Sequence, residues 1–232
     1  MDPRHRLIVA LDVSTAAAAR EIVAAVGDSA FTYKVGMQLY TAEGPSIVRE
    51  LIDSGRRVFL DLKYHDIPNT VAAAVREAAT LGVAMLTVHA SGGGDMLRAA
   101  VEAAEATKPG LLVLGVTVLT SLDEVDLGKI GVRGAVPEQV LRLAALALSN
   151  GCRGVVASAQ EAAALRKEFG PDIAIVTPGV RLAGSDPHDQ ARIITPAEAI
   201  AAGASHIVVG RPIAAAADPA AEARAILGQM AI

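Results

Sequence analysis

Short apolar segments rich in β-branched residues recur along the whole chain. They span residues 7–12, 31–36, 57–63, 85–90, 111–117, 153–158, 173–178 and 206–211. Each is nearly continuous in apolar character, which is typical of strands covered on both faces. Stretches rich in Ala, Leu, Glu and Arg with helical spacing lie between them, as at residues 15–26 and 69–82. The pattern predicts strands that alternate with helices.

Eight such repeats in 232 residues average 29 residues each, which is the size of one strand–helix unit. This spacing predicts an α/β protein, a single (β/α)8 TIM barrel over residues 1–232. A doubly wound sheet is the alternative, but no GxGxxG sequence follows the first apolar segment. In a barrel, catalytic side chains are expected at the C-terminal ends of the strands.

Composition narrows the class of protein. Hydrophobic residues make up 52% of the chain and aromatic residues only 3%, so the core must consist mainly of Ala, Val, Leu and Ile. A net charge of −4 and the absence of Trp argue against a nucleic-acid partner, because such surfaces are basic and often carry stacking rings. One cysteine excludes an internal disulfide framework. The first apolar run ends at Asp12, too early for a signal peptide or a membrane span, so we expect a cytoplasmic protein with no membrane partner.

Polar residues stand where the predicted strands end, as the barrel requires. They are Asp12, Lys34, Asp61, Lys63, His89, Thr117, Ser158, Pro178, Gly179, Gly210 and Arg211. Charged residues would be costly at these positions if the strand ends only closed a core. The strand ends therefore predict a functional site.

The segment DLKYHDIPNT, residues 61–70, is the densest group of such residues. Residues i and i+2 of a strand face the same side, so Asp61 and Lys63 are expected to point together. Asp66 follows in the loop, and Lys34 adds a second cation from the neighbouring strand. Such an array is either a structural ion-pair network or a catalytic site. Its position at the mouth of the predicted barrel favours a site.

The loops after the seventh and eighth predicted strands have the composition of a phosphate site. They contain Gly179 and Arg181 in VTPGVR (176–181), and Gly210 and Arg211 in HIVVGRPI (206–213). Barrels often hold phosphate at these two loops, where glycines admit the ligand and arginines donate two hydrogen bonds each. The alternative is that these glycines only form turns.

Two further expectations concern the same region. The segment from Leu182 to Arg192 is long and polar, with Gly184 and Pro187, and is predicted to be a mobile lid. Arg211 and Pro212 are expected to open the last helix of the chain.

Other residues are weaker candidates. The glycines at 92–94 lack the Lys-Ser/Thr of a phosphate-binding P-loop and are expected to form a turn before a helix. Cys152 precedes an apolar strand without a nearby base and is interpreted as a packed thiol. His89 is expected to support the site rather than to catalyse. His65 and Asp66 lack a second ligand cluster at metal-binding spacing, so no metal site is predicted.

The string DLKYHDIPNTV (61–71) resembles the signature of the orotidine 5′-monophosphate decarboxylase family. Further segments follow in the order of that family: LDV (11–13), YKVG (33–36), VTVLTS (116–121), VTPGVR and HIVVGRPI. Tyr64 stands where the family often has Phe, which leaves the charged positions unchanged.

The resemblance implies a decarboxylase of pyrimidine biosynthesis that converts the nucleotide orotidine 5′-monophosphate to UMP and CO₂ without a metal or a cofactor. Lys63 would donate the proton to C6, and Asp61 would lie beside the departing carboxylate. Lys34 and Asp12 would hold the ribose hydroxyls. Lys34, Asp61, Lys63 and Asp66 would form the catalytic group.

The resemblance also implies a homodimer, in which Asp66 and Thr70 enter the site of the partner subunit. Thr120 and Ser121 would line the pyrimidine pocket. The phosphate would be held by Arg181, Gly210, Arg211 and, on the closing loop, Gln190. Ile67 and Pro178 would be further substrate contacts.

Two other functions remain open at this point. A keto-sugar-phosphate decarboxylase on a similar barrel would share Asp61, Lys63 and the phosphate loops but would use magnesium and an enediolate intermediate. The HDIPNT and LTS segments argue against it. A non-catalytic barrel that binds nucleotide phosphates would keep Arg211 but would have little need of Lys63 between two aspartates.

Overall fold

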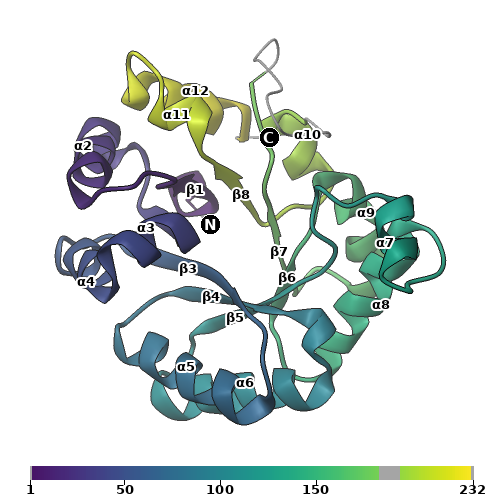
Figure 1. Ribbon diagram of the computed structural model, residues 1–232. Helices are drawn as coiled ribbons and strands as arrows, with labels where there is room; N and C mark the ends of the chain where they lie inside the picture. Colours follow the sequence, from purple (N-terminus) through teal and green to yellow (C-terminus); the bar gives the residue numbers. More distant parts are fainter. Residues whose placement is uncertain (1, 183–193, 231–232) are drawn as a thin grey trace.

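The computed structural model describes residues 2–182 and 194–230. Within these ranges, parallel strands pair in sequence order and the last pairs with the first, so the sheet closes into a barrel (Figure 1). The strands are β1 (Leu7–Ala10), β2 (Thr32–Gly36), β3 (Arg57–Tyr64), β4 (Met85–His89), β5 (Leu112–Val116), β6 (Gly154–Val156), β7 (Ala174–Thr177) and β8 (His206–Val209). The (β/α)8 barrel predicted from the apolar repeats is confirmed.

Helices surround this barrel (Figure 1). They are α1 (Pro3–Arg6), α2 (Ala16–Val26), α3 (Met37–Glu43), α4 (Pro45–Asp53), α5 (Pro68–Thr80), α6 (Gly94–Thr107), α7 (Glu124–Lys129), α8 (Val136–Ser149), α9 (Ala159–Phe169), α10 (Pro196–Ala201), α11 (Arg211–Ala214) and α12 (Pro219–Met230), with 3₁₀ turns η1 (Gly27–Ser29) and η2 (Ala90–Gly92). The two helices predicted by spacing are α2 and α5. Thr15 caps α2 by accepting the Ala18 N–H, and Pro68 suits the first turn of α5, where no backbone donor is needed. In the described ranges, no helix combines the length and the apolar character that a membrane span needs.

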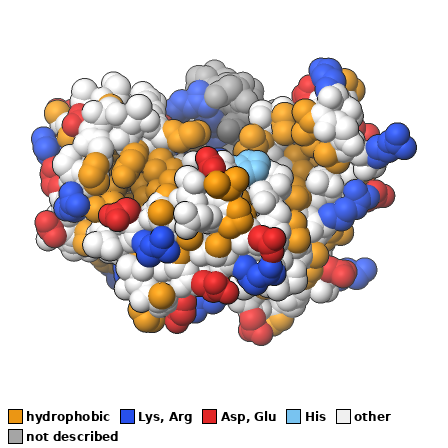
Figure 2. Space-filling model, turned by 60° about the horizontal axis from the view of Figure 1, so that its bottom comes forward, with side chains coloured by type: hydrophobic (Ala, Val, Ile, Leu, Met, Phe, Trp, Pro, Cys, Tyr) orange, Lys and Arg blue, Asp and Glu red, His pale blue; other side chains and the backbone are white. Residues whose placement is uncertain are grey.

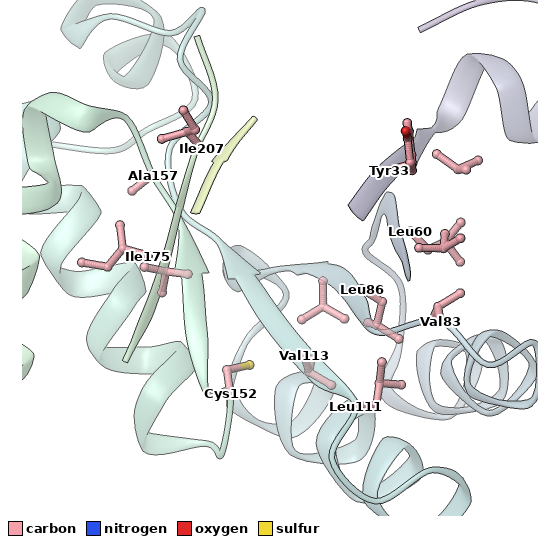
Figure 3. Packing of buried hydrophobic residues seen from close by; sticks show 14 of the residues in the cluster. Tyr33, Leu60, Val83, Leu86, Leu111, Val113, Cys152, Ala157, Ile175 and Ile207 are labelled. Carbon is pink, nitrogen blue, oxygen red and sulfur yellow. The ribbon is translucent and has the colours of Figure 1, made fainter. Parts of the chain in front are cut away.

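Hydrophobic side chains form two concentric layers because consecutive strand residues face opposite sides of the sheet. The inner layer fills the barrel with Ile8, Ala10, Phe59, Met85, Leu114, Val176 and Val208. The outer layer packs the strands against the helices, and Figure 3 shows Leu60, Leu86 and Ile207 within it. Since Leu60 belongs to the outer layer, its neighbours Phe59 and Asp61 face the barrel interior. The fold thus places Asp61 at the mouth of the barrel, above a packed apolar floor.

Several boundaries differ from the sequence prediction. The predicted strand 7–12 ends at Ala10, although the Leu11 N–H still donates to the Lys34 carbonyl at 3.0 Å. Arg211 begins a helix of four residues, and α12 follows it. The expectation that Arg211 opens the last helix is therefore wrong. A short additional helix after the eighth strand is a common feature of barrels that bind phosphate.

Candidate active site

Alternating charges run across three neighbouring strand ends. Asp12 Oδ1 lies 2.8 Å from Lys34 Nζ, which lies 3.8 Å from Asp61 Oδ2. Asp61 Oδ1 in turn lies 2.9 Å from Lys63 Nζ. The side chains of Lys34 and Asp61 are only 12% and 13% exposed. Each of these charges faces an opposite one, which offsets the cost of partial burial.

Lys63 has an unusual backbone. Its φ is 52°, and within residues 2–182 and 194–230 it is the only non-glycine residue with a positive φ. Such a conformation costs about 1–3 kcal/mol and persists only where the surroundings enforce it. The pairing of β3 with β4 shifts register between Leu60 and Tyr64, which accommodates the irregularity. The expectation that Asp61 and Lys63 point together is confirmed by their contact of 2.9 Å, although the backbone at Lys63 departs from regular strand geometry.

Two adjoining cavities open at this charged array. The larger, of about 380 Å³, is lined by Asp12, Lys34, Asp61, Pro178, Gly179, Arg181, Gly210 and Arg211, among others. The smaller, of about 170 Å³, is lined by Lys63, Thr120 and several apolar residues, including Phe59, Val116 and Val118. Lys34, Asp61 and Pro178 border both cavities. A ligand that fills both cavities would therefore pass beside Asp61.

The larger cavity has the donors expected of an anion site. Gly179 has a φ of 77°, which favours glycine at this close turn. Arg181 is only 5% exposed, and its backbone N–H donates to the Ile194 carbonyl at 3.0 Å. Its Nε has no hydrogen-bond partner among the described residues. A buried guanidinium N–H beside a cavity is a site for an acceptor such as a phosphate oxygen.

Some expected site residues lie outside these cavities. Asp66 is exposed on the loop after β3, where its Oδ1 accepts the Ile67 N–H at 2.6 Å. Within the described part of the chain, no ion pair joins Asp66 to Lys63. Ile67 is 68% exposed, and Thr70 and Ser121 are also exposed. Gln190 and nearly all of the expected lid at 182–192 lie outside the described residues.

The weaker candidates have structural positions. Cys152 is buried in the outer layer (Figure 3), and burial raises the pKa of its thiol to about 12, as expected of a packed cysteine. The glycines at 92–94 form the turn between β4 and α6. His89 Nδ1 lies 2.7 Å from Ser91 Oγ, and its ring stacks on His65 at 5.3 Å. Burial, followed by the nearby His65 and Lys63, lowers the pKa of His89.

The sequence pattern did not single out Thr87 and Gly36. The Thr87 hydroxyl donates to Asp61 Oδ1 at 3.1 Å and accepts the Lys63 N–H at 2.9 Å. A Cβ at Gly36 would lie 3.0 Å from Lys34 Nζ, so this glycine keeps room for the lysine. Alternation along β4 offers a signal for Thr87, because residues 85, 87 and 89 share the face that points into the barrel.

Known proteins share both the sequence and the fold. Residues 5–226 match the Orotidine 5′-phosphate decarboxylase / HUMPS family. The orotidine 5′-phosphate decarboxylase of Moorella thermoacetica is 51% identical over 99% of this chain and 94% of the relative. The orotidine 5′-phosphate decarboxylase of Anaeromyxobacter dehalogenans is 54% identical over 97% of this chain and 98% of the relative. The crystal structure of the Lactobacillus acidophilus orotidine 5′-phosphate decarboxylase superposes with a TM-score of 0.88 at 38% identity, over 98% of this chain and all of that one. This chain therefore belongs to the Orotidine 5′-phosphate decarboxylase / HUMPS family.

Proposed function

We propose that this protein decarboxylates orotidine 5′-monophosphate to UMP and CO₂ in pyrimidine biosynthesis. The observation that carries the proposal is the contact of 2.9 Å between Lys63 Nζ and Asp61 Oδ1, at the junction of the two cavities. The smaller, largely apolar cavity suits the pyrimidine, with Thr120 as a polar contact. The larger cavity suits the ribose and phosphate. Pro178 lines both cavities and would contact both parts of the nucleotide.

Lys63 supplies the chemistry in this proposal. Loss of CO₂ from C6 leaves an electron pair in the plane of the ring, where the π system delocalises it poorly. An ammonium group fixed beside C6 stabilises this charge and then donates its proton to the carbon. Asp61 holds the ammonium in place and lies beside the departing carboxylate. No cofactor is needed, because the proton and the stabilising charge come from the same side chain.

The phosphate contributes to catalysis at a distance. Arg181 and Arg211 line the larger cavity together with Gly210, and Asp12 and Lys34, which line the same cavity, are the proposed ribose contacts. Binding energy from groups that do not react can be used to order the reacting centre. We include Gln190 in the phosphate contacts, on the loop that would close over the substrate.

We further propose a homodimer in which Asp66, Ile67 and Thr70 complete the site of the partner subunit. All three residues are exposed, and Asp66 and Ile67 line a surface cavity of about 470 Å³ together with His65 and Pro68. On the face seen in Figure 2, where α5 and α6 come forward, hydrophobic side chains form patches between charged ones. Exposed apolar patches of this kind commonly mark interfaces. We also include Ser121, which is exposed next to the cavity residue Thr120, among the nucleotide contacts.

The direct test is to add orotidine 5′-monophosphate to the purified protein and to follow the loss of orotate absorbance. Turnover is expected to survive exhaustive EDTA treatment, because the Asp61 carboxylate already contacts Lys34, Lys63 and Thr87. Activity that disappears with EDTA and returns with magnesium would instead support a keto-sugar-phosphate type of reaction. Cell fractionation is expected to place the enzyme in the cytoplasm.

A further inference from the structure

We propose that Thr87 is a positioning residue that holds the Asp61–Lys63 pair in its reactive arrangement. This inference rests on the proposed decarboxylation, and it assigns a role to a residue on β4 that does not line either cavity. Thr87 is completely buried, and its hydroxyl lies beside the two charged side chains at the barrel mouth.

The Thr87 hydroxyl closes a ring of hydrogen bonds. It accepts the backbone N–H of Lys63 at 2.9 Å and donates to Asp61 Oδ1 at 3.1 Å. The same oxygen of Asp61 accepts a hydrogen bond from Lys63 Nζ at 2.9 Å. Thr87 therefore holds the backbone of Lys63, and Asp61, which Thr87 also contacts, holds its ammonium.

A hydroxyl is suited to this position because it has one donor and two acceptor sites. The Lys63 N–H occupies an acceptor site, which leaves the hydroxyl proton to point at the carboxylate. In a regular parallel ladder, the Lys63 N–H would donate to a backbone carbonyl of β4. Because the register between β3 and β4 shifts here, the Thr87 hydroxyl accepts this hydrogen bond instead. It thereby supports the positive φ of Lys63.

The chain offers a matched control for this role. Thr32 is also completely buried on a barrel strand, but its hydroxyl has no hydrogen-bond partner among the described residues. Thr87→Val and Thr32→Val make the same chemical change, from hydroxyl to methyl, with nearly the same volume. Only the first removes contacts to Asp61 and Lys63. A difference between the two variants therefore reports the hydrogen bonds rather than packing.

The kinetic test compares kcat and KM for orotidine 5′-monophosphate. Thr87→Val is expected to lower kcat by about 10- to 100-fold with KM nearly unchanged, since misplacing a catalytic group by about 1 Å can cost 100-fold. Thr87→Ser should restore kcat to within about threefold of the wild type, and Thr32→Val should leave it unchanged. If Thr87→Val does not fold, Thr87→Ser and Thr87→Ala make the same comparison, because they differ by one hydroxyl. A variant without the hydroxyl that keeps the wild-type kcat, or an equal loss in Thr32→Val, overturns the proposal.

A second measurement does not depend on activity. The Lys63 amide should exchange its hydrogen slowly in the wild type and at least tenfold faster in Thr87→Val, but not in Thr32→Val. Unchanged exchange in Thr87→Val overturns the positioning role. If the wild type does not turn over orotidine 5′-monophosphate, the proposed function fails, and amide exchange still decides whether Thr87 positions Lys63.

Discussion

The ammonium of Lys63 depends on neighbours from two strands for its place at the barrel mouth. Asp61 on β3 holds the ammonium, while Thr87 on β4 holds the backbone of the same lysine. Lys34 Nζ lies 3.8 Å from the other carboxylate oxygen of Asp61, Oδ2, and offsets its negative charge. This arrangement leaves little freedom for Lys63 Nζ, and fixed charge of this kind is what stabilises a developing carbanion.

Removal of the Lys63 side chain tests the role of its ammonium. Lys63→Ala should reduce kcat to below about 1% of the wild type while the protein still folds and binds UMP, because the change removes both the cation and the proton donor. Lys129→Ala is the control, since Lys129 also lies 2.9 Å from an aspartate but on the exposed surface of α7. Its kcat should not change. Orotate absorbance measures turnover, and calorimetry measures UMP binding. A Lys63→Ala enzyme that retains more than a few per cent of kcat would contradict the assigned role.

The charged site residues and the meeting of Asp61 with Lys63 can be predicted from the sequence, but the backbone conformation of Lys63 cannot. Asp61 and Lys63 interrupt an apolar strand, and that contrast is visible in a single chain. The positive φ of Lys63 follows from pairing with β4, which no local pattern encodes. Strand alternation places Thr87 on the face of β4 that points into the barrel, but threonine is common in strands, so its hydrogen bonds with Asp61 and Lys63 cannot be predicted from the sequence.

The ends of the elements β7 and β8 supply the residues of the proposed phosphate site. The turn at Gly179 follows β7, and α11 starts directly after β8 at Arg211. Arg181 is buried, whereas Arg211 is exposed at its helix start. Two guanidinium groups from different elements can thus approach one phosphate from two directions.

Removal of Arg211 should affect the nucleotide more than the nucleoside. Arg211→Ala is expected to lower kcat/KM for orotidine 5′-monophosphate at least 100-fold, but kcat/KM for orotidine by less than threefold, because only the nucleotide carries the phosphate. Arg224→Ala on α12, which is also exposed, should change neither value. Steady-state kinetics with both substrates measure the difference. Equal losses on both substrates would mean that Arg211 has a structural role.

The opposite end of β8 contains a buried histidine that should make stability depend on pH. Burial, with smaller effects of Arg57 and Arg6, lowers the pKa of His206 from 6.5 to about 4. The unfolded chain therefore binds a proton more readily than the folded chain between these values, and stability falls as the pH drops through this range. The expected loss is on the order of 2–3 kcal/mol, at about 1.4 kcal/mol per pKa unit.

Urea unfolding at pH 7 and pH 4.5 tests the effect of His206. His206→Gln should lose less stability between the two pH values than the wild type does, because Gln does not titrate. An unaltered dependence in His206→Gln would show that other groups cause the acid sensitivity.

The order of elements is more predictable than their limits. All the apolar segments between residues 7 and 211 coincide with barrel strands, because a strand buried on both faces must be apolar throughout. The observed strand ends differ from the predicted ones by one or two residues. The polar residues after a strand can either form further ladder hydrogen bonds or belong to the loop, and the sequence does not distinguish the two. The short helix α11 has too few residues for a periodic pattern and could not be separated from α12.

In the whole molecule, as far as the structure describes it, Asp66 does not contact Lys63 of its own chain, so an active site that needs both residues would be incomplete in one chain. The barrel brings Asp12, Lys34, Asp61 and Lys63 together, while Asp66 and Thr70 remain exposed outside the cavities. A twofold axis would bring the same exposed segment of each chain to the partner. Each site would then need residues from both chains.

Mixing inactive variants tests this shared site. Lys63→Ala and Asp66→Ala homodimers should each be nearly inactive, because every site lacks one member. A mixed dimer has one site with both changes and one intact site, which takes Lys63 from the Asp66→Ala chain and Asp66 from the Lys63→Ala chain. Random exchange of equal amounts makes about half the dimers mixed, so activity should rise towards about one quarter of the wild-type value. Asp12→Ala mixed with Lys63→Ala is the control and should not recover, because Asp12 and Lys63 belong to the same chain's site. Mass spectrometry verifies the exchange, and exchange without recovered activity would show that Asp66 does not serve the partner's site.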